Sequence, residues 1–217
     1  MAVYPYRPVK RRIRFSRTEV GHILLAVAVL TFAFALWLRF LYGFLGGLIL
    51  AGVAVPTGFL LHELGHKVVA QRYGFVAEFR AWYFGLGLAV FTAIVGFLFA
   101  APGAVHIGMA MGTRRQAGRI SAAGPLVNLA IGGSFALLWL VLVLARLNLA
   151  MGMSLTLVDV VAGVAFINAL LGVFNMLPFP PLDGSKIVQW DLRSYLVLLL
   201  PLVALVVVGF LFFNPFG

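Results

Sequence analysis

The sequence predicts an all-α polytopic membrane protein, with about five transmembrane helices and a small membrane-associated β-hairpin or sheet around residues 74–111. Of the 217 residues, 63% are hydrophobic and 10% are charged, and the mean hydropathy is +1.09. An ordinary soluble domain carries roughly 25% charged residues. Uncharged runs that are long enough to cross a bilayer, which takes about 20 residues, recur along the chain. These runs fit four to six crossings, and the lipid bilayer is therefore the first partner that the sequence implies.

The first two crossings follow a basic N-terminal arm. Residues 1–19 carry six cations and are expected to form a cytosolic arm. They do not have the pattern of a cleavable signal peptide, because the apolar run that follows is long enough to span the membrane and no small-residue cleavage site is obvious. Residues 20–38 are uncharged and form the first predicted helix. A short turn at 39–43 leads to the second predicted helix, at 44–72. Several glycines in the second helix favour close packing against a neighbouring helix.

The stretch between residues 74 and 113 does not have the pattern of an ordinary crossing. Residues 75–82 are typical of a short strand, and residues 81–113 contain no Asp, Glu, Lys or Arg. This length falls short of the roughly 40 residues that two crossings and a turn require. Glycines and Pro102 interrupt it, so we expect a membrane-dipping hairpin covered by the helices. The alternative is one further short spanning helix at 86–101.

Three more helices are expected after this stretch. They cover residues 120–145, 155–176 and 196–213. Three prolines between residues 178 and 181 end the middle one, because proline cannot continue a helix. Asp183 follows the break directly. No soluble module is evident, so residues 20–217 are expected to form a single transmembrane domain.

The net charge of +10 does not indicate a nucleic-acid-binding protein. The Lys and Arg residues flank the apolar runs, where the positive-inside rule expects them. With the N-terminus in the cytosol and five crossings, 14 of the 16 cations lie on the cytosolic side. A crossing at 86–101 would reverse this bias, so the charge pattern favours five. Residues 62–66 and Asp183 then both lie nearer the cytosolic side.

The sequence His-Glu-Leu-Gly-His at 62–66 has the pattern of a zinc site. His62 and His66 are four residues apart and share one face of a helix, and neutral imidazoles are good zinc ligands. The chain has no cysteine, so further ligands must be His, Asp or Glu. Asp183 is the best third ligand because it has the same expected depth as His66. Two histidines and one carboxylate leave one position open, which is typical of a catalytic site with one Zn²⁺ per chain, and Glu63 is the expected general base.

Other polar residues in the apolar helices are weaker candidates. Asn175 and Asn128 each carry an amide that can donate a hydrogen bond to a polarised peptide carbonyl, and both are predicted catalytic residues. Hydrogen bonding between helices is the alternative for both, and Asn168 is assigned to packing. Glu19 is expected at the membrane interface, and Lys67 is expected to mark the cytosolic exit of the second helix.

Taken together, these motifs resemble the site-2 protease family of intramembrane zinc metalloproteases. The resemblance rests on residues 62–66, Gly124-Pro125-x-x-Asn128 and Asn175-x-x-Pro178-x-x-Pro181-Leu182-Asp183-Gly184, within a catalytic core at about 44–190. It implies zinc held by His62, His66 and Asp183, and Glu63 as general base and acid. It also implies hydrolysis of peptide bonds in or near the transmembrane helices of a protein substrate. The form is compact, without the PDZ or CBS modules of many members.

Two other functions fit some of the same residues. A metal-ion transporter would use the same ligands, but its ligands would lie along a path, and Glu63 would have no role. A non-catalytic member would act as a membrane chaperone, although every residue that the chemistry requires is present. The substrate and the oligomeric state are not determined by the sequence.

Overall fold

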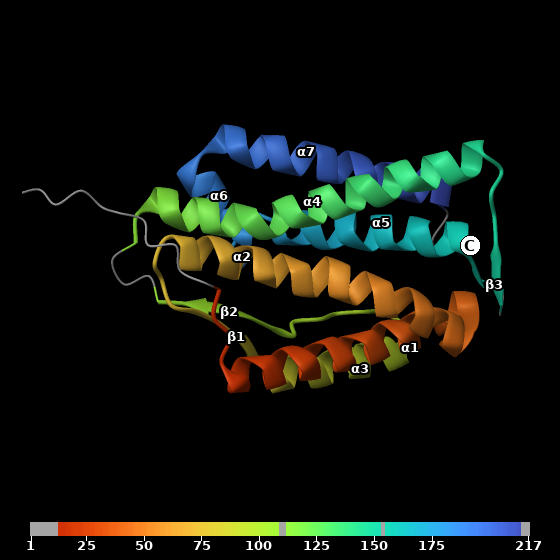
Figure 1. Cartoon of the computed structure of the whole chain (residues 1–217), viewed down its shortest axis with the longest axis horizontal. Helices are drawn as coiled ribbons and strands as arrows, with labels where there is room; N and C mark the ends of the chain where they lie inside the picture. The colour runs from red at the N-terminus through yellow and green to blue at the C-terminus, as the bar shows by residue number, and fades with distance from the viewer. Residues whose placement is uncertain (1–12, 109–111, 153–154, 214–217) are drawn as a thin grey trace, which may run out of the picture.

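Residues 13–108, 112–152 and 155–213 are described by a computed structural model of the chain, shown in Figure 1. The first 12 residues of the expected basic arm, and residues 109–111 of the expected hairpin region, lie outside this description. In chain order the elements are α1 (Arg17–Val55), η1 (Pro56–Leu60), α2 (Leu61–Arg72), β1 (Ala77–Ala81), α3 (Tyr83–Val95), β2 (Gly103–Ile107), α4 (Arg114–Leu144), β3 (Ala150–Gly152), β4 (Leu155–Thr156), α5 (Leu157–Asn175), α6 (Asp183–Trp190), α7 (Leu192–Val208) and η2 (Gly209–Phe213).

The first helical run turns back on itself at Gly43. This residue has φ 68° and ψ 169°, a conformation that glycine adopts without steric cost. A Cβ on Gly47 would lie 2.8 Å from the carbonyl oxygen of Ala35, so the two arms on either side of the turn touch closely. The expected turn at 39–43 is therefore present, and it divides residues 17–72 into two antiparallel arms (Figure 1).

Within the described residues, four helices are long and apolar enough to cross a membrane. The first of them, Arg17–Arg72, is the run that Gly43 divides, so four helices provide five apolar arms. The predicted fold class, a mostly helical membrane protein with a small sheet, is confirmed. Figure 1 shows α2 between α4 on one side and α1 with α3 on the other, so α2 lies inside the bundle.

The region after α2 contains the expected hairpin and, between its two strands, a short helix. Strands β1 and β2 form an antiparallel hairpin in which Phe79 pairs with Val105. Between them lies α3, whose 13 residues extend about 20 Å at 1.5 Å per residue. This is shorter than the roughly 30 Å of hydrocarbon, so the alternative of a spanning helix at 86–101 is wrong. The chain runs along α1 as α3 and then returns to the hairpin (Figure 1).

Three elements, β3, β4 and α6, were not expected from the sequence. Strands β3 and β4 form a small antiparallel ladder at the end of the bundle opposite the β1–β2 hairpin (Figure 1). The proline-rich segment is followed at once by the short helix α6, whose first residue is Asp183. The Asp183 carboxylate, which was expected directly after the proline break, therefore lies at a helix N-terminus, a position that favours negative charge.

Candidate active site

Two imidazoles and one carboxylate from distant parts of the chain meet inside the bundle. His62 and His66 lie one turn apart on α2, and their Nε2 atoms are 3.0 Å apart. The Oδ2 atom of Asp183 lies 3.3 Å from Nε2 of His62 and 3.0 Å from Nε2 of His66. All three residues are buried. The structure thus brings together the three residues that the sequence proposed as metal ligands.

These three atoms have the spacing that one tetrahedral zinc ion requires. Two ligand atoms at the usual zinc distance of about 2.0 Å, at a tetrahedral angle, lie roughly 3.3 Å from each other. The observed separations of 3.0–3.3 Å match this value. Within the described part of the chain, this is the one group of three or more His, Asp or Glu side chains close enough to hold a metal ion. The donor set therefore fits zinc, the cofactor that the sequence predicts.

Gly124 on α4 provides the space that the two imidazoles occupy. A Cβ atom at this position would lie 2.5 Å from Nε2 of both His62 and His66. Real Cβ atoms do not approach other atoms so closely, so any larger residue must displace at least one ring. The glycine of the Gly-Pro pair is therefore required by the close contact between α4 and α2.

The other nitrogen of each imidazole is hydrogen-bonded to α4. Nδ1 of His62 bonds Oδ1 of Asn128, and Nδ1 of His66 lies 2.8 Å from the carbonyl oxygen of Ile120. Because these partners accept hydrogen bonds, they fix the proton on Nδ1 and leave Nε2 as the metal-binding atom. Both rings are therefore oriented from α4.

The Asn128 amide is itself held on both sides. Its Nδ2 donates to the carbonyl oxygen of Gly58 at 2.8 Å and to Oδ1 of Asn168 at 3.3 Å. Asn168 in turn donates to the Val164 carbonyl oxygen at 2.9 Å and to the Thr57 hydroxyl at 3.2 Å. Asn128 is fully buried and has already used both of its amide protons. This arrangement suits the orientation of His62 better than a bond to a substrate carbonyl.

Glu63 lies beside the metal ligands and contacts the hairpin. Its Oε2 atom accepts a hydrogen bond of 3.0 Å from the backbone N–H of Val105 on β2. The sequence carried no sign of this contact, because a backbone amide looks the same in every residue. The Glu63 carboxylate is therefore bonded directly to strand β2.

The site opens into a cavity of about 270 Å³. Its lining includes the three candidate metal ligands, Glu63 and four residues of β2. It also includes Asn175 at the end of α5, Pro181 from the segment before α6 and Lys186 from α6 itself. Asn175 donates one amide proton to the Leu171 carbonyl oxygen at 3.0 Å, so its second amide proton is left for another acceptor. Asn175 can therefore donate a hydrogen bond to another group, whereas both amide protons of Asn128 are already used.

Glu19 and Lys67 are not at the surface, and the expectation that Glu19 is an interfacial residue is wrong. Both are fully buried, and Nζ of Lys67 lies 2.6 Å from Oε1 and 2.7 Å from Oε2 of Glu19. The same ammonium donates to the Ala77 carbonyl oxygen at 2.9 Å, and Glu19 accepts from the Phe79 N–H at 2.9 Å. Each charge is neutralised and hydrogen-bonded, which is what permits burial. The pair fastens β1 to both α1 and α2.

The chain has recognisable relatives. Residues 50–195 match peptidase family M50. The candidate zinc metalloprotease MJ0611 of Methanocaldococcus jannaschii is 37% identical over 191 residues, which make up 88% of this chain and 93% of that protein. The candidate zinc metalloprotease Rip3 of Mycobacterium tuberculosis is 33% identical over 145 residues, which make up 66% of this chain and 30% of Rip3. No solved structure matches the chain.

Proposed function

The chain belongs to peptidase family M50 and is an intramembrane zinc metalloprotease, and on this premise we propose that it hydrolyses peptide bonds in or near transmembrane helices of membrane proteins. One observation carries the proposal. A His-His-Asp metal site, an acidic residue and a strand edge share one cavity inside a bundle of apolar helices. A cavity at this position is reached most directly by a substrate that is itself in the membrane.

The roles of the four central residues follow from their chemistry. His62, His66 and Asp183 hold the zinc ion, which acts as a Lewis acid and makes water more acidic when it is bound. Glu63 accepts the proton of the attacking water and later donates it to the nitrogen of the leaving amine. Its position next to His62 in the chain, and on the lining of the same cavity, supports this role.

The two asparagines have different roles in this proposal. Asn128 is a positioning residue, since it holds His62 and its own amide protons are used within the protein. Asn175 donates its second amide proton to the carbonyl oxygen of the bond that is cleaved, where negative charge develops. The fact that Asn175 lines the cavity supports this assignment.

The substrate must be extended at the cleavage site. In a helix each peptide carbonyl is hydrogen-bonded within the chain, and the bond is protected. The cavity is lined by Gly103, Val105 and Ile107 of β2, so the edge of this strand is available to pair with an unwound segment. Pairing of this kind would hold the scissile bond next to the metal ligands.

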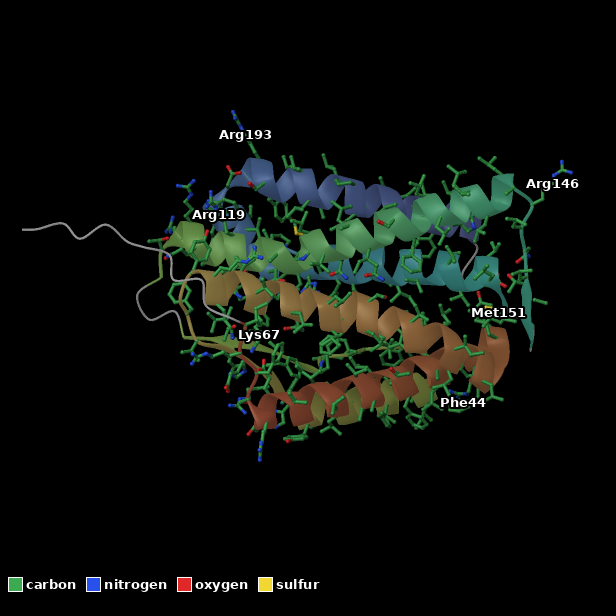
Figure 2. The ribbon with its side chains drawn as sticks, viewed as in Figure 1. Phe44, Lys67, Arg119, Arg146, Met151 and Arg193 are labelled. Atoms are coloured by element: carbon green, nitrogen blue, oxygen red, sulfur yellow. The ribbon has the colours of Figure 1, made fainter. Side chains whose placement is uncertain are left out.

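We place the N-terminus and the active site toward the cytosol. Figure 2 shows Lys67, Arg119 and Arg193 toward one end of the bundle and Phe44, Arg146 and Met151 toward the other. The end with the metal site and the hairpin also carries most of the described cations, and the positive-inside rule assigns it to the cytosolic side. Residues 20–217 form one domain in this proposal, with the catalytic core at about 44–190.

The test uses Glu63→Gln in the purified, zinc-loaded full chain. The variant is expected to keep one zinc ion per chain and to lose cleavage of a fluorescent transmembrane peptide in detergent micelles. The matched control is Glu78→Gln, because Glu78 pairs with Arg80 on β1 and is part of no catalytic group. Cleavage retained by Glu63→Gln would overturn the assignment of the base. Absence of cleavage in the unaltered protein, with zinc bound, would overturn the proposed function.

A further inference from the structure

The hairpin contains a pair of residues whose backbone N–H groups point in opposite directions. Phe79 and Val105 lie opposite each other on β1 and β2. Neither N–H bonds the partner strand, because Phe79 donates to Glu19 and Val105 donates to Glu63. They are therefore a non-hydrogen-bonded pair of an antiparallel ladder, with each N–H directed to an outer edge.

Bonds at both ends of the hairpin confirm this alternation. Gly108 donates its N–H to the Val76 carbonyl oxygen at 3.0 Å, and Trp82 donates its N–H to the Pro102 carbonyl oxygen at 2.9 Å. In an antiparallel ladder, hydrogen-bonded pairs alternate with non-hydrogen-bonded pairs. Val105 is in a non-hydrogen-bonded pair, so its backbone N–H and C=O groups point away from β1. This outward edge lines the catalytic cavity.

The Val105 N–H has two possible partners that exclude each other. A substrate segment that extends β2 must place a carbonyl oxygen on this N–H, since it is the outward donor at the middle of the strand. The same N–H is now taken by Oε2 of Glu63, at 3.0 Å. One N–H forms one good hydrogen bond, so substrate pairing and the Glu63 contact compete.

We propose that the Val105 N–H is a latch on Glu63, and that an extended substrate segment opens the latch by taking this hydrogen bond as it pairs with β2. The inference rests on the proposed function. It makes the release of Glu63 from β2 depend on a correctly paired substrate, because the paired segment takes the bond that holds Oε2. Val105 acts through its main chain and is a positioning residue, while Glu63 remains the group that handles the proton.

The latch is tested by binding to two inactive variants of the zinc-loaded full chain. In Glu63→Gln the side-chain carbonyl still accepts from Val105, whereas in Glu63→Ala no acceptor remains. The probe is a fluorophore-labelled synthetic peptide of about 20 apolar residues with a central Asn-Gly pair, which weakens its helix. We expect Glu63→Ala to bind the probe about 3–10-fold more tightly, the effect of one hydrogen bond that no longer has to be broken.

Two proline substitutions separate the latch from a change in cavity size. Val105→Pro removes the donor and leaves the ladder to β1 intact, because proline is tolerated where the N–H faces outward. In that background the two Glu63 variants should bind the probe equally. Ile107→Pro is the matched control, since its N–H also faces outward by alternation and bonds no part of Glu63, and it should preserve the difference.

The outcomes distinguish this inference from the function on which it rests. Equal binding by Glu63→Ala and Glu63→Gln, or a difference that persists with Val105→Pro, overturns the latch. If the unaltered protein cleaves the same peptide in that case, the proposed function stands. If it neither binds nor cleaves the peptide, both the function and the latch are overturned.

Discussion

The two outer edges of the β1–β2 hairpin differ in what covers them. Along β1, the outward groups are bonded by helix side chains: Lys67 binds the Ala77 carbonyl oxygen, Glu19 binds the Phe79 N–H and His22 accepts from the Ala81 N–H. Along β2, in the described residues, one side chain bonds the edge, and it is Glu63, the proposed base. The first edge is closed by a structural ion pair, and the second is directed at the cavity.

This difference indicates how a membrane protein can leave one strand edge accessible to a substrate without unwanted pairing at the other edge. Unpaired edge groups invite pairing with other chains. The β1 edge is blocked by charges that are costly to separate, so it stays closed. The β2 edge is held by a single bond that another extended chain is able to replace. Damage to the β1 edge should therefore reduce stability, and damage near the β2 edge should reduce catalysis.

The largest expected effect is on the catalytic side, at Gly124. Gly124→Ala places a methyl group 2.5 Å from Nε2 of both metal-binding histidines, so at least one ring must move off the metal. We expect zinc content to fall from one per chain to near zero and peptide cleavage to be lost with it. Zinc is measured by atomic emission on the purified protein.

The matched control for Gly124→Ala is Gly133→Ala on the same helix. A Cβ at Gly133 meets nothing within 4 Å, so this variant should keep its zinc and gain about 1 kcal/mol of helix stability. A Gly124→Ala protein that binds zinc as tightly as the unaltered chain would contradict the close contact between α4 and α2.

The closed edge is tested by Lys67→Met. This substitution leaves the Glu19 carboxylate buried without its partner, which costs about 3–5 kcal/mol in the free energy of unfolding. The measurement is unfolding by a denaturing detergent, followed by circular dichroism. Cleavage per folded molecule should change far less than for Gly124→Ala.

Two further variants make the Lys67 test specific. Replacing both partners, as Lys67→Met with Glu19→Leu, should recover part of the loss, because no unpaired charge remains. Arg193→Met serves as the control for removing a positive charge, since Arg193 is exposed. A loss of stability in Arg193→Met equal to that of Lys67→Met would contradict the importance of the buried pair.

An intermediate effect is expected at Asn128, which orients His62 from behind. Asn128→Ala removes the bond to Nδ1 of His62, and loss of such a partner typically weakens metal binding about 10–100-fold. Competition with a chelator measures the zinc affinity. Ser134→Ala on the same helix is the control, because Ser134 is exposed and bonds the Ala130 carbonyl oxygen within its own helix. Unchanged affinity in Asn128→Ala would leave that asparagine with a packing role.

The metal site could be predicted from the sequence for two reasons. The spacing of His62 and His66 fixes them on one helix face, and the chain holds few acids, so the search for a third ligand ended quickly at Asp183. The hairpin and the turn near Gly43 were also indicated, by lengths and by glycines. These features depend on local patterns, which a single sequence contains.

The remaining features depend on contacts that local patterns do not encode. The partners Glu19 and Lys67 are 48 residues apart, and each alone resembles an ordinary interfacial charge. The contact between Glu63 and Val105 uses a backbone N–H, which has no residue signature. The role of Asn128 depended on which neighbours would use its amide protons, and this follows only from how α4, α5 and η1 pack.

The smallest expected effect lies at Asp191, which belongs to neither edge. Asp191 caps α7, and the hydrogen bonds from the Ser194 hydroxyl, at 2.6 Å, and from the Ser194 N–H, at 2.8 Å, lower the pKa of its carboxyl group. A lowered pKa in the folded state adds stability above the unfolded pKa of about 3.9, and this contribution disappears as the pH falls through the folded value.

Asp191→Asn keeps an acceptor but cannot ionise, so the unaltered chain should be slightly more stable near pH 7, and the two should converge below about pH 4. Thermal unfolding across this pH range measures the difference. A difference that does not change with pH would show that the charge plays no part in the cap, and a loss of cleavage would show that α7 affects the catalytic cavity.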